Sequence, residues 1–200
     1  MGFVNILPII AVAFVFVFFL VLGYNNIKKE RAAFKGMAGQ FDGYCPKFFL
    51  RCCLIGAFRG FPLKIFYTQP HENTPEYLRY YLKYRAGFKL RIYPETTNTR
   101  LSKMVRVVRE VEIGDISFDE AFMILSNDPG RAVQFLSGQD KKDTVRELFK
   151  RGFDSLVMDG KTIFAVKPYR SNDTALQEIS FQKTREVLEL MFKFGSGAGV

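Results

Sequence analysis

The chain has few of the residues that metal sites and disulfide-bonded scaffolds require. It contains one histidine and three cysteines among 200 residues. A single histidine, His71, excludes a site built from several histidines, and an odd number of cysteines argues against the paired framework of small secreted proteins. Cys52 and Cys53 are adjacent and no Cys-x-x-Cys spacing occurs, so the usual spacing of a zinc site is missing. We therefore predict no metal, no cofactor and reduced thiols.

Motifs that support catalysis are also missing. The sequence has no Gly-x-Ser-x-Gly elbow, no Walker-type phosphate loop and no Gly-x-Gly-x-x-Gly after a strand. Glu110 and Glu112 share one face of an expected strand, which permits acid–base chemistry but is more typical of a solvated edge. Capping of the helix that follows explains Ser126 and Asp128. These absences favour a protein that is not an enzyme and has no catalytic residues.

Charged side chains are absent from a long apolar run, Phe3 to Tyr24. At about 1.5 Å per residue this run makes a helix of roughly 33 Å, enough to cross a hydrocarbon core of about 30 Å. The alternative is a cleaved signal peptide, which needs a basic segment in front and small residues at the cleavage site. Both are missing, so residues 1–24 predict a retained transmembrane helix.

The charges after this run set its predicted orientation. Basic residues crowd the carboxyl side, so the positive-inside rule places the N-terminus outside and residues 25–200 in the cytoplasm. We expect a single-pass protein of the bacterial inner membrane. Phe14 and Phe18 share one helical face and can pack against another protein's helices, or else they face lipid. The basic residues expected at the membrane surface are Lys28, Lys29, Arg31 and Lys35.

The rest of the chain predicts an α+β domain with a small mixed or antiparallel sheet, because strand and short-helix signals are interspersed without regular alternation. We expect a basic juxtamembrane helix or linker at 25–43 and the cytoplasmic domain at 44–194. A flexible tail is expected at 195–200. The whole fold is thus predicted to be one transmembrane helix followed by this α+β domain.

Turn signals predict two hairpins. Arg59-Gly60 separates two apolar stretches, and Asp159-Gly160 is the clearest signal in the chain, typical of a type I′ turn between two strands. Other strands are expected at 88–93, at 105–113 and, with a helical turn as the alternative, at 118–125.

Capping signals predict the helices. Thr74 and Pro75 suit the start of a helix at 75–86, and Asp128 followed by Pro129 suits the start of another. A short helix is expected at 140–151. Apolar residues at helical intervals predict an amphipathic helix within 173–194 that packs on the sheet.

Charge is distributed unevenly, with a net charge of +11 over residues 1–110 and −2 over residues 111–200. Between residues 77 and 93, tyrosines are interleaved with lysine and arginine. This mixture suits an anionic headgroup layer or an acidic protein surface; nucleic acid is the third choice, because a bilayer tether lies next to the segment. Some of the tyrosines can instead pack the predicted helix onto the sheet. The candidate binding residues here are Tyr77, Arg79, Tyr80, Tyr81, Lys83, Tyr84, Arg85, Lys89 and Arg91.

One segment carries a resemblance to a known family. It contains an acidic residue, a Phe-acidic-x-x-Phe pattern, a Ser-x-Asp step into a helix, and a hairpin. These are Glu112, Phe118, Asp119, Phe122, Ser126, Asp128 and the Asp159-Gly160 turn. The segment resembles a family of bacterial membrane-anchored proteins of unknown function, and covers between a quarter and a third of the chain. The resemblance implies an anchored α+β domain and supplies no catalytic residues.

These features together predict a non-catalytic accessory or scaffolding subunit of a larger integral membrane complex. A respiratory or photosynthetic host would fit the Phe-rich span. The alternative is a membrane-tethered module that binds anionic lipid or takes part in signalling. The expected partners are integral membrane subunits and anionic lipid headgroups, with no small-molecule substrate.

Overall fold

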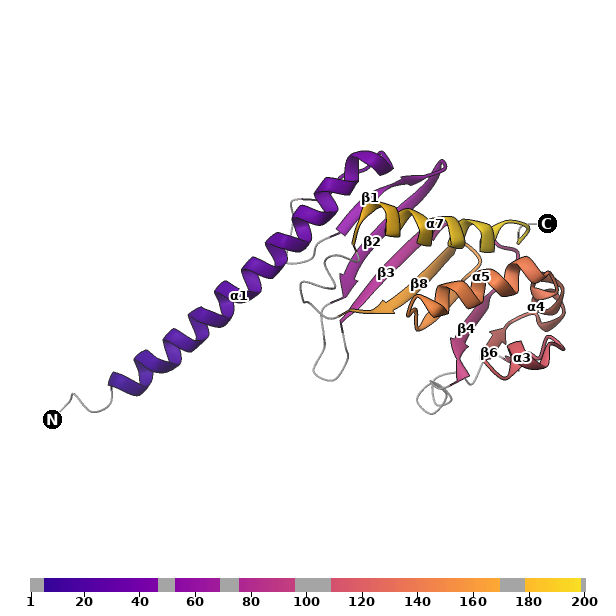
Figure 1. The fold of residues 1–200 in the computed structure, drawn as a ribbon, viewed down its shortest axis with the longest axis horizontal. Helices are drawn as coiled ribbons and strands as arrows, with labels where there is room; N and C mark the ends of the chain where they lie inside the picture. Colours follow the sequence, from indigo (N-terminus) through magenta and orange to yellow (C-terminus); the bar gives the residue numbers. More distant parts are fainter. Residues whose placement is uncertain (1–5, 47–52, 69–75, 96–108, 170–178, 199–200) are drawn as a thin grey trace.

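An antiparallel sheet of eight strands forms the centre of the molecule (Figure 1). The computed structural model describes residues 6–46, 53–68, 76–95, 109–169 and 179–198; the side chains of residues 6–9, 19, 20, 22, 23, 26 and 109 also lie outside this description. The spatial order of the strands is β1-β2-β3-β8-β7-β4-β6-β5. They are β1 Cys53–Phe58, β2 Phe61–Thr68, β3 Tyr77–Lys83, β4 Leu90–Pro94, β5 Arg109–Glu110, β6 Phe122–Ser126, β7 Ser155–Met158 and β8 Thr162–Pro168.

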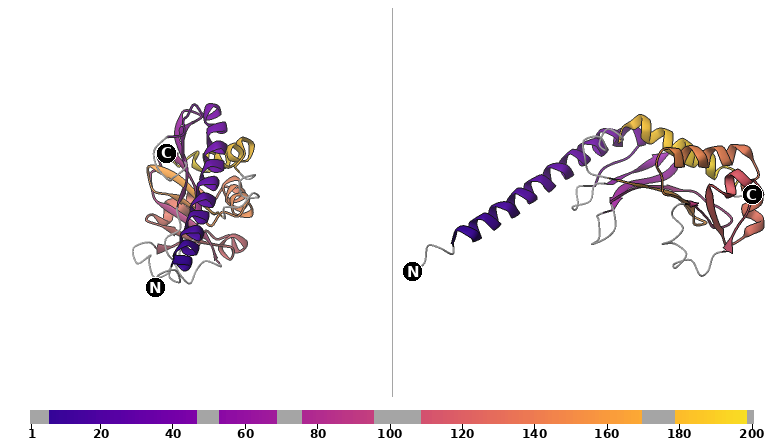
Figure 2. Two further views of the ribbon diagram at one scale, coloured as in Figure 1. Left: turned by 90° about the vertical axis from the view of Figure 1, so that its left-hand side faces the viewer. Right: turned by 60° about the horizontal axis from the view of Figure 1, so that its bottom comes forward.

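The helices that pack on the sheet gather on one of its faces, as Figure 2 shows for α1, α5 and α7. On strand β3, Leu78, Tyr80 and Leu82 are buried toward these helices, whereas the residues between them point to the opposite face. No described helix lies on that opposite face, which we call the helix-free face. The helical elements are α1 Ile6–Ala38, the 3-10 turn η1 Gly39–Phe41, α3 Ile116–Asp119, α4 Pro129–Leu136, α5 Gln139–Lys150 and α7 Phe181–Gly195.

Both predicted hairpins are present. β1 and β2 join through Arg59 and Gly60, which both have positive φ, as a type I′ turn requires. β7 and β8 join at Asp159-Gly160, where the Asp159 carboxylate accepts hydrogen bonds from the backbone N–H groups of Lys161 and Thr162. The type I′ turn expected there is wrong, because Gly160 has positive φ and Asp159 does not. The helix that begins at Pro129 is also confirmed, since Asp128 accepts from the backbone N–H of Arg131.

The helix predicted at 75–86 is wrong, because this segment forms strand β3 in the middle of the sheet, between β2 and β8. The segment 118–125 contains both alternatives, a helical turn in α3 and strand β6. The C-terminal amphipathic helix is shorter than the window from which it was predicted and starts at Phe181, where Ser180 caps it. Of the strand expected at 105–113, residues 109–113 are described, and only Arg109–Glu110 form a strand, β5.

The predicted transmembrane helix at residues 1–24 is wrong, and with it the single-pass membrane protein that the fold class assumed. Within the described residues, no helix combines the length and the apolar character that crossing a bilayer takes. α1 has 33 residues, Ile6–Ala38. From Lys28 onward the same helix is charged. Residues 1–5 of the predicted span lie outside the described part.

Of the two alternatives expected at 25–43, the structure has the helix, whereas the flexible tail expected at 195–200 is wrong for its described residues. Within 25–43, α1 runs on without interruption to Ala38, and Phe34, Met37 and Phe41 are buried against the sheet and α7. At the other terminus Ala198 is buried, and its carbonyl accepts a hydrogen bond of 2.9 Å from the backbone N–H of Gly87. The described chain is therefore packed almost to its last residues.

Candidate interaction surfaces

The amino-terminal part of α1 extends away from the domain as an isolated rod (Figure 1). We call residues 10–24 of this helix the apolar arm. Its described large apolar side chains are more than half exposed, with Phe14 at 72% and Val12 at 70%. A contiguous exposed apolar surface of this kind marks an interaction site. The exposed members are Ile10, Val12, Phe14, Val15, Phe16, Val17, Phe18, Val21 and Tyr24.

The apolar arm is apolar on every side. Successive residues of a helix point about 100° apart, so the five consecutive residues from Phe14 to Phe18, all Phe or Val, cover the full circumference. A helix that is hydrophobic all round needs an apolar environment all round. The arm is therefore built to be surrounded and not to lie on a flat surface with one face in water.

The base of the arm is held firmly by the domain. Phe34 is fully buried and its ring lies 5.2 Å from that of Tyr67 on β2. Tyr169 follows β8 in the chain, and its hydroxyl donates a hydrogen bond of 3.3 Å to the carboxylate of Glu30. Burial is the largest cause that raises the pKa of Tyr169, so this hydroxyl keeps its proton at neutral pH. The arm thus leaves the domain in a direction fixed by packed side chains.

Basic residues surround the base of the arm. Lys28, Lys29 and Lys35 are exposed. Arg31 is half-buried and donates a hydrogen bond of 3.1 Å to the carbonyl of Pro46. Three of the four predicted cations are therefore on the surface, and the fourth ties the helix to the chain before β1.

The helix-free face carries part of the predicted basic and aromatic segment. Tyr77, Arg79, Tyr81 and Lys83 alternate along β3 on this face. The ring of Tyr81 stacks on two neighbours from adjacent strands, Phe66 at 5.3 Å and Phe164 at 5.2 Å. Cations flank this row: Lys64 lies over the Phe66 ring at 4.8 Å, and Arg91 is exposed on β4. Sequence reasoning missed Phe66, Phe164 and Lys64, because only the strand register places them beside Tyr81.

The other predicted residues do not join this row. Tyr80 is 3% exposed on the helix-covered face, and its ring lies 5.7 Å from that of Phe153. Tyr84 packs against Phe61 and Phe192. Arg85 and Lys89 are exposed between the ends of β3 and β4. The nine candidate residues therefore divide between the core, the helix-free face and a loop, and do not form one patch.

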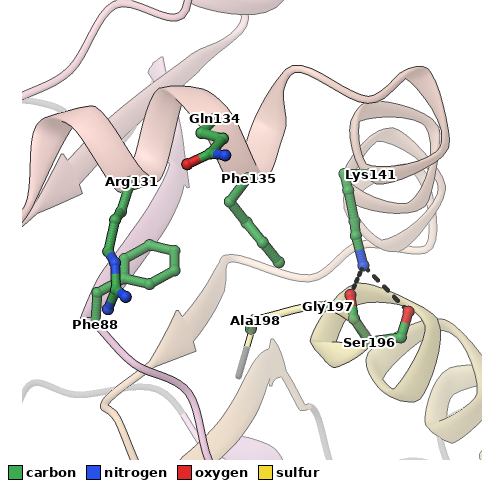
Figure 3. Close-up of a pocket in the computed structure, with 8 residues that line it drawn as sticks. All are labelled: Phe88, Arg131, Gln134, Phe135, Lys141, Ser196, Gly197 and Ala198. Carbon is green, nitrogen blue, oxygen red and sulfur yellow. Dashed lines mark hydrogen bonds between the residues drawn. The ribbon is translucent and has the colours of Figure 1, made fainter. Parts of the chain in front are cut away.

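A cavity of about 320 Å³ lies beside the end of α7 (Figure 3). One of its two cations, Lys141 of α5, donates hydrogen bonds to the carbonyls of Lys193 and Phe194 at 2.7 and 2.8 Å, and to the carbonyl and hydroxyl of Ser196. Desolvation by burial is the main cause that lowers its pKa. Lys141 caps the carboxyl end of α7, where unpaired carbonyls and the helix dipole favour a cation. Its role in this cavity is structural.

The remaining candidate groups are placed as follows. Ser126 donates to the carbonyl of Lys89 at 2.8 Å and accepts from the backbone N–H of Asp128, so both side chains serve the local turn and cap. Among the described residues, no three His, Cys, Asp or Glu side chains converge as metal ligands do. Cys45 and Cys53 are free thiols. His71 and Cys52 lie outside the described residues.

Comparison with known proteins reveals a similar fold. Neither the protein-family models nor the curated proteins compared with this chain match it, so the resemblance drawn from the sequence stays a prediction. A solved structure is similar, the crystal structure of the mycobacterial trehalose monomycolate transport factor A, TtfA. The TM-score is 0.50 at 12% sequence identity, over 80% of this chain and 95% of TtfA. At this identity, what the chain has in common with TtfA is its fold.

Proposed function

We propose that the chain is a non-catalytic accessory subunit of a membrane-bound assembly, and that the apolar arm is the element by which it docks. The observation that carries this proposal is the exposure of apolar side chains around the whole circumference of residues 14–18. Burying an exposed Phe or Val side chain contributes about 1.5–3 kcal/mol. Leaving this many such side chains in water is costly unless a partner covers them.

The partner that fits the arm is a set of apolar helices in an integral membrane protein. Such helices offer an apolar surface on several sides of a guest helix, which matches the circumferential pattern of the arm. Lys28, Lys29 and Lys35 at the base then lie where acidic side chains or anionic headgroups meet the assembly's surface. The rigid base supports such docking, because a pre-oriented helix loses less conformational entropy on binding.

The proposed location is a cell membrane, with the folded domain on the cytoplasmic side. Two observations support this side. Cys45 and Cys53 are free thiols, which suit a reducing compartment. The exposed cations at the base of the arm match the anionic lipid of a cytoplasmic leaflet.

The test is co-purification of the full chain from its own membranes in a gentle detergent, followed by separation by native mass. We expect the chain to migrate in one defined high-mass assembly. Purification through a tag on a partner subunit should recover the same assembly. Phe14→Asp combined with Phe16→Asp should release it as a monomer. Ile116→Asp is the matched control, because Ile116 is 77% exposed on α3, away from the arm. A wild-type chain that elutes only as a monomer contradicts the proposal.

The lipid-binding module remains the second candidate function, supported by the row of rings and cations on the helix-free face. Vesicles with and without phosphatidylserine distinguish the two. If this surface binds lipid, changing Lys64, Lys83 and Arg91 together to alanine abolishes binding to the anionic vesicles, whereas the Phe14 and Phe16 variant keeps it. If docking through the arm is the main function, the alanine variant stays in the high-mass assembly.

A further inference from the structure

A second cavity opens on the helix-covered side of the sheet, between β3 and α7. Its volume is about 230 Å³. The floor consists of the buried side chains Leu78, Tyr80, Phe153 and Val187, each less than 9% exposed. A floor of this kind prefers an apolar group to water, because water in an apolar cavity lacks hydrogen-bond partners.

The mouth of this cavity is charged and mainly positive. Arg151, Lys167 and Lys183 line it together with one carboxylate, Glu186. Glu147 pairs with Arg151 from outside the lining, at 2.9 Å. An apolar floor below a positively charged mouth is the arrangement that a small amphiphilic anion needs.

Arg151 is held in a fixed orientation at this mouth. Its Nε donates to Glu147 at 2.9 Å and its Nη1 to Glu186 at 2.6 Å. The hydrogen bond to Glu186 is the main cause that raises the pKa of Arg151 and lowers that of Glu186, so both stay charged at neutral pH. Nη2 is the guanidinium nitrogen that these two bonds do not use. A pre-oriented guanidinium binds a carboxylate at a lower entropic cost than a mobile one.

Lys183 supplies the second cation. It lies in the first turn of α7, where the positive end of the helix dipole adds to its charge. Its side chain is exposed, so its ammonium group can turn toward a ligand at the mouth. Lys183 and Arg151 therefore approach the cavity from two elements, α7 and the end of α5.

We propose that this cavity binds a small amphiphilic carboxylate, with its short aliphatic or aromatic body on Leu78, Tyr80 and Phe153 and its carboxylate between Lys183 and Arg151. The volume of the cavity limits the body to a small group, because drug-sized ligands occupy about 300–1,000 Å³. This site lies in the folded domain and does not depend on the apolar arm. It adds a ligand to the proposed docking function, one that the sequence did not predict.

Octanoate is the probe, with octanol as its uncharged counterpart. The experiment is an NMR titration of the full chain, in which the shifts of Leu78, Tyr80 and Val187 report on the cavity and those of the apolar arm report separately. We expect saturable shifts at the cavity with a Kd near or below about 1 mM, a level within reach of a ligand of this size. Octanol should bind there at least about tenfold more weakly, since it lacks the charge.

Lys183→Glu tests the cation, and Arg185→Glu on the same helix is its matched control because Arg185 is not part of the lining. Lys183→Glu should weaken octanoate binding about tenfold or more and leave octanol unchanged, whereas Arg185→Glu should change octanoate binding less than about twofold. Lys183→Arg should restore binding. Equal binding of octanol and octanoate, an equal loss in both glutamate variants, or shifts confined to the apolar arm would each overturn the proposal while leaving the docking function untouched.

Discussion

Asp115 joins helix α3 to helix α5 through its carboxylate. It accepts a hydrogen bond from the backbone N–H of Phe118 and thereby caps α3, and it pairs with Lys142 of α5 at 2.6 Å and with Arg146 at 3.8 Å. The hydrogen bond from Lys142 is the largest cause that lowers the pKa of Asp115 from 3.8 to about 2. The ionised carboxylate is therefore favoured by folding.

This lowered pKa predicts how stability changes in acid. Because the folded pKa is below the unfolded one, the contribution of Asp115 is fully present above about pH 4 and is lost as the pH falls toward 2. Asp115→Asn should remove this contribution, so the urea concentration at the unfolding midpoint should change less between pH 4 and pH 2 than it does in the wild type. Asp140→Asn, at a carboxylate whose side chain is 83% exposed, should keep the wild-type slope. Parallel curves for Asp115→Asn and wild type would show that the pair does not act as described.

At the scale of elements, the segment after α1 crosses strand β1 in close contact. This contact fixes where α1, and with it the arm, is attached to the sheet. Gly43 and Gly56 face each other there. A Cβ placed on Gly56 would clash with the carbonyl oxygen of Phe41 and lie 3.1 Å from the Cα of Gly43. These neighbours are backbone atoms, which cannot move aside as a flexible side chain does. Tyr44 and Ile55 exchange backbone hydrogen bonds of 2.8 and 3.0 Å beside the crossing.

Gly56→Ala should therefore destabilise the domain by about 1–3 kcal/mol, the usual cost of overpacking a filled site. Chemical denaturation followed by circular dichroism measures this change. Gly36→Ala is the control inside α1, where a Cβ would meet nothing within 4 Å; it should be neutral or stabilise by up to about 1 kcal/mol, because alanine favours the helix. If the two variants unfold at the same denaturant concentration, the crossing is not tightly packed.

Elements with strong local signals could be predicted from the sequence, whereas β3 could not. Asp159-Gly160 and Asp128-Pro129 specify their turn and cap through their own backbone and side chains. Thr74-Pro75 resembles a helix start equally well, yet the period-two alternation of residues 77–83 and the pairing with β2 and β8 make this segment a strand. Tertiary pairing overrides a capping signal when a sheet offers partners on both sides.

The candidate surfaces could also be predicted only in part from the sequence. The apolar run of the arm is visible in the sequence, and so is the excess of cations near it. Which tyrosines remain on the surface depends on the alternation of side chains along β3, because successive residues of a strand point to opposite faces of the sheet. The predicted helix has no such alternation, and it left Tyr80 among the surface residues although this side chain is buried. The carboxylate-binding cavity combines residues from β3, β8, α7 and the end of α5, so only the tertiary structure brings Lys183 and Arg151 together.

At the scale of the whole molecule, α1 belongs to two regions with different roles. Its last third is part of the core, through Phe34 and Met37, whereas the apolar arm is exposed. A chain of residues 25–200 should therefore unfold at nearly the same urea concentration as the full chain, because burial inside the domain is unchanged. A chain of residues 44–200 should lose at least about 3 kcal/mol, since removing Phe34, Met37 and Phe41 uncovers Leu54, Phe58 and Tyr67.

Urea denaturation of these two truncated chains measures how much residues 1–24 and 25–43 stabilise the domain. Their native mass shows separately whether each chain still joins the assembly. The chain of residues 25–200, which lacks the apolar arm but keeps the rest of α1, should be folded but absent from the high-mass assembly. A large loss of stability on removing residues 1–24 alone would mean that the arm packs against its own domain, and docking by an exposed helix would then lose its basis. Full stability after removal of residues 1–43 would contradict the assignment of Phe34 and Met37 to the core.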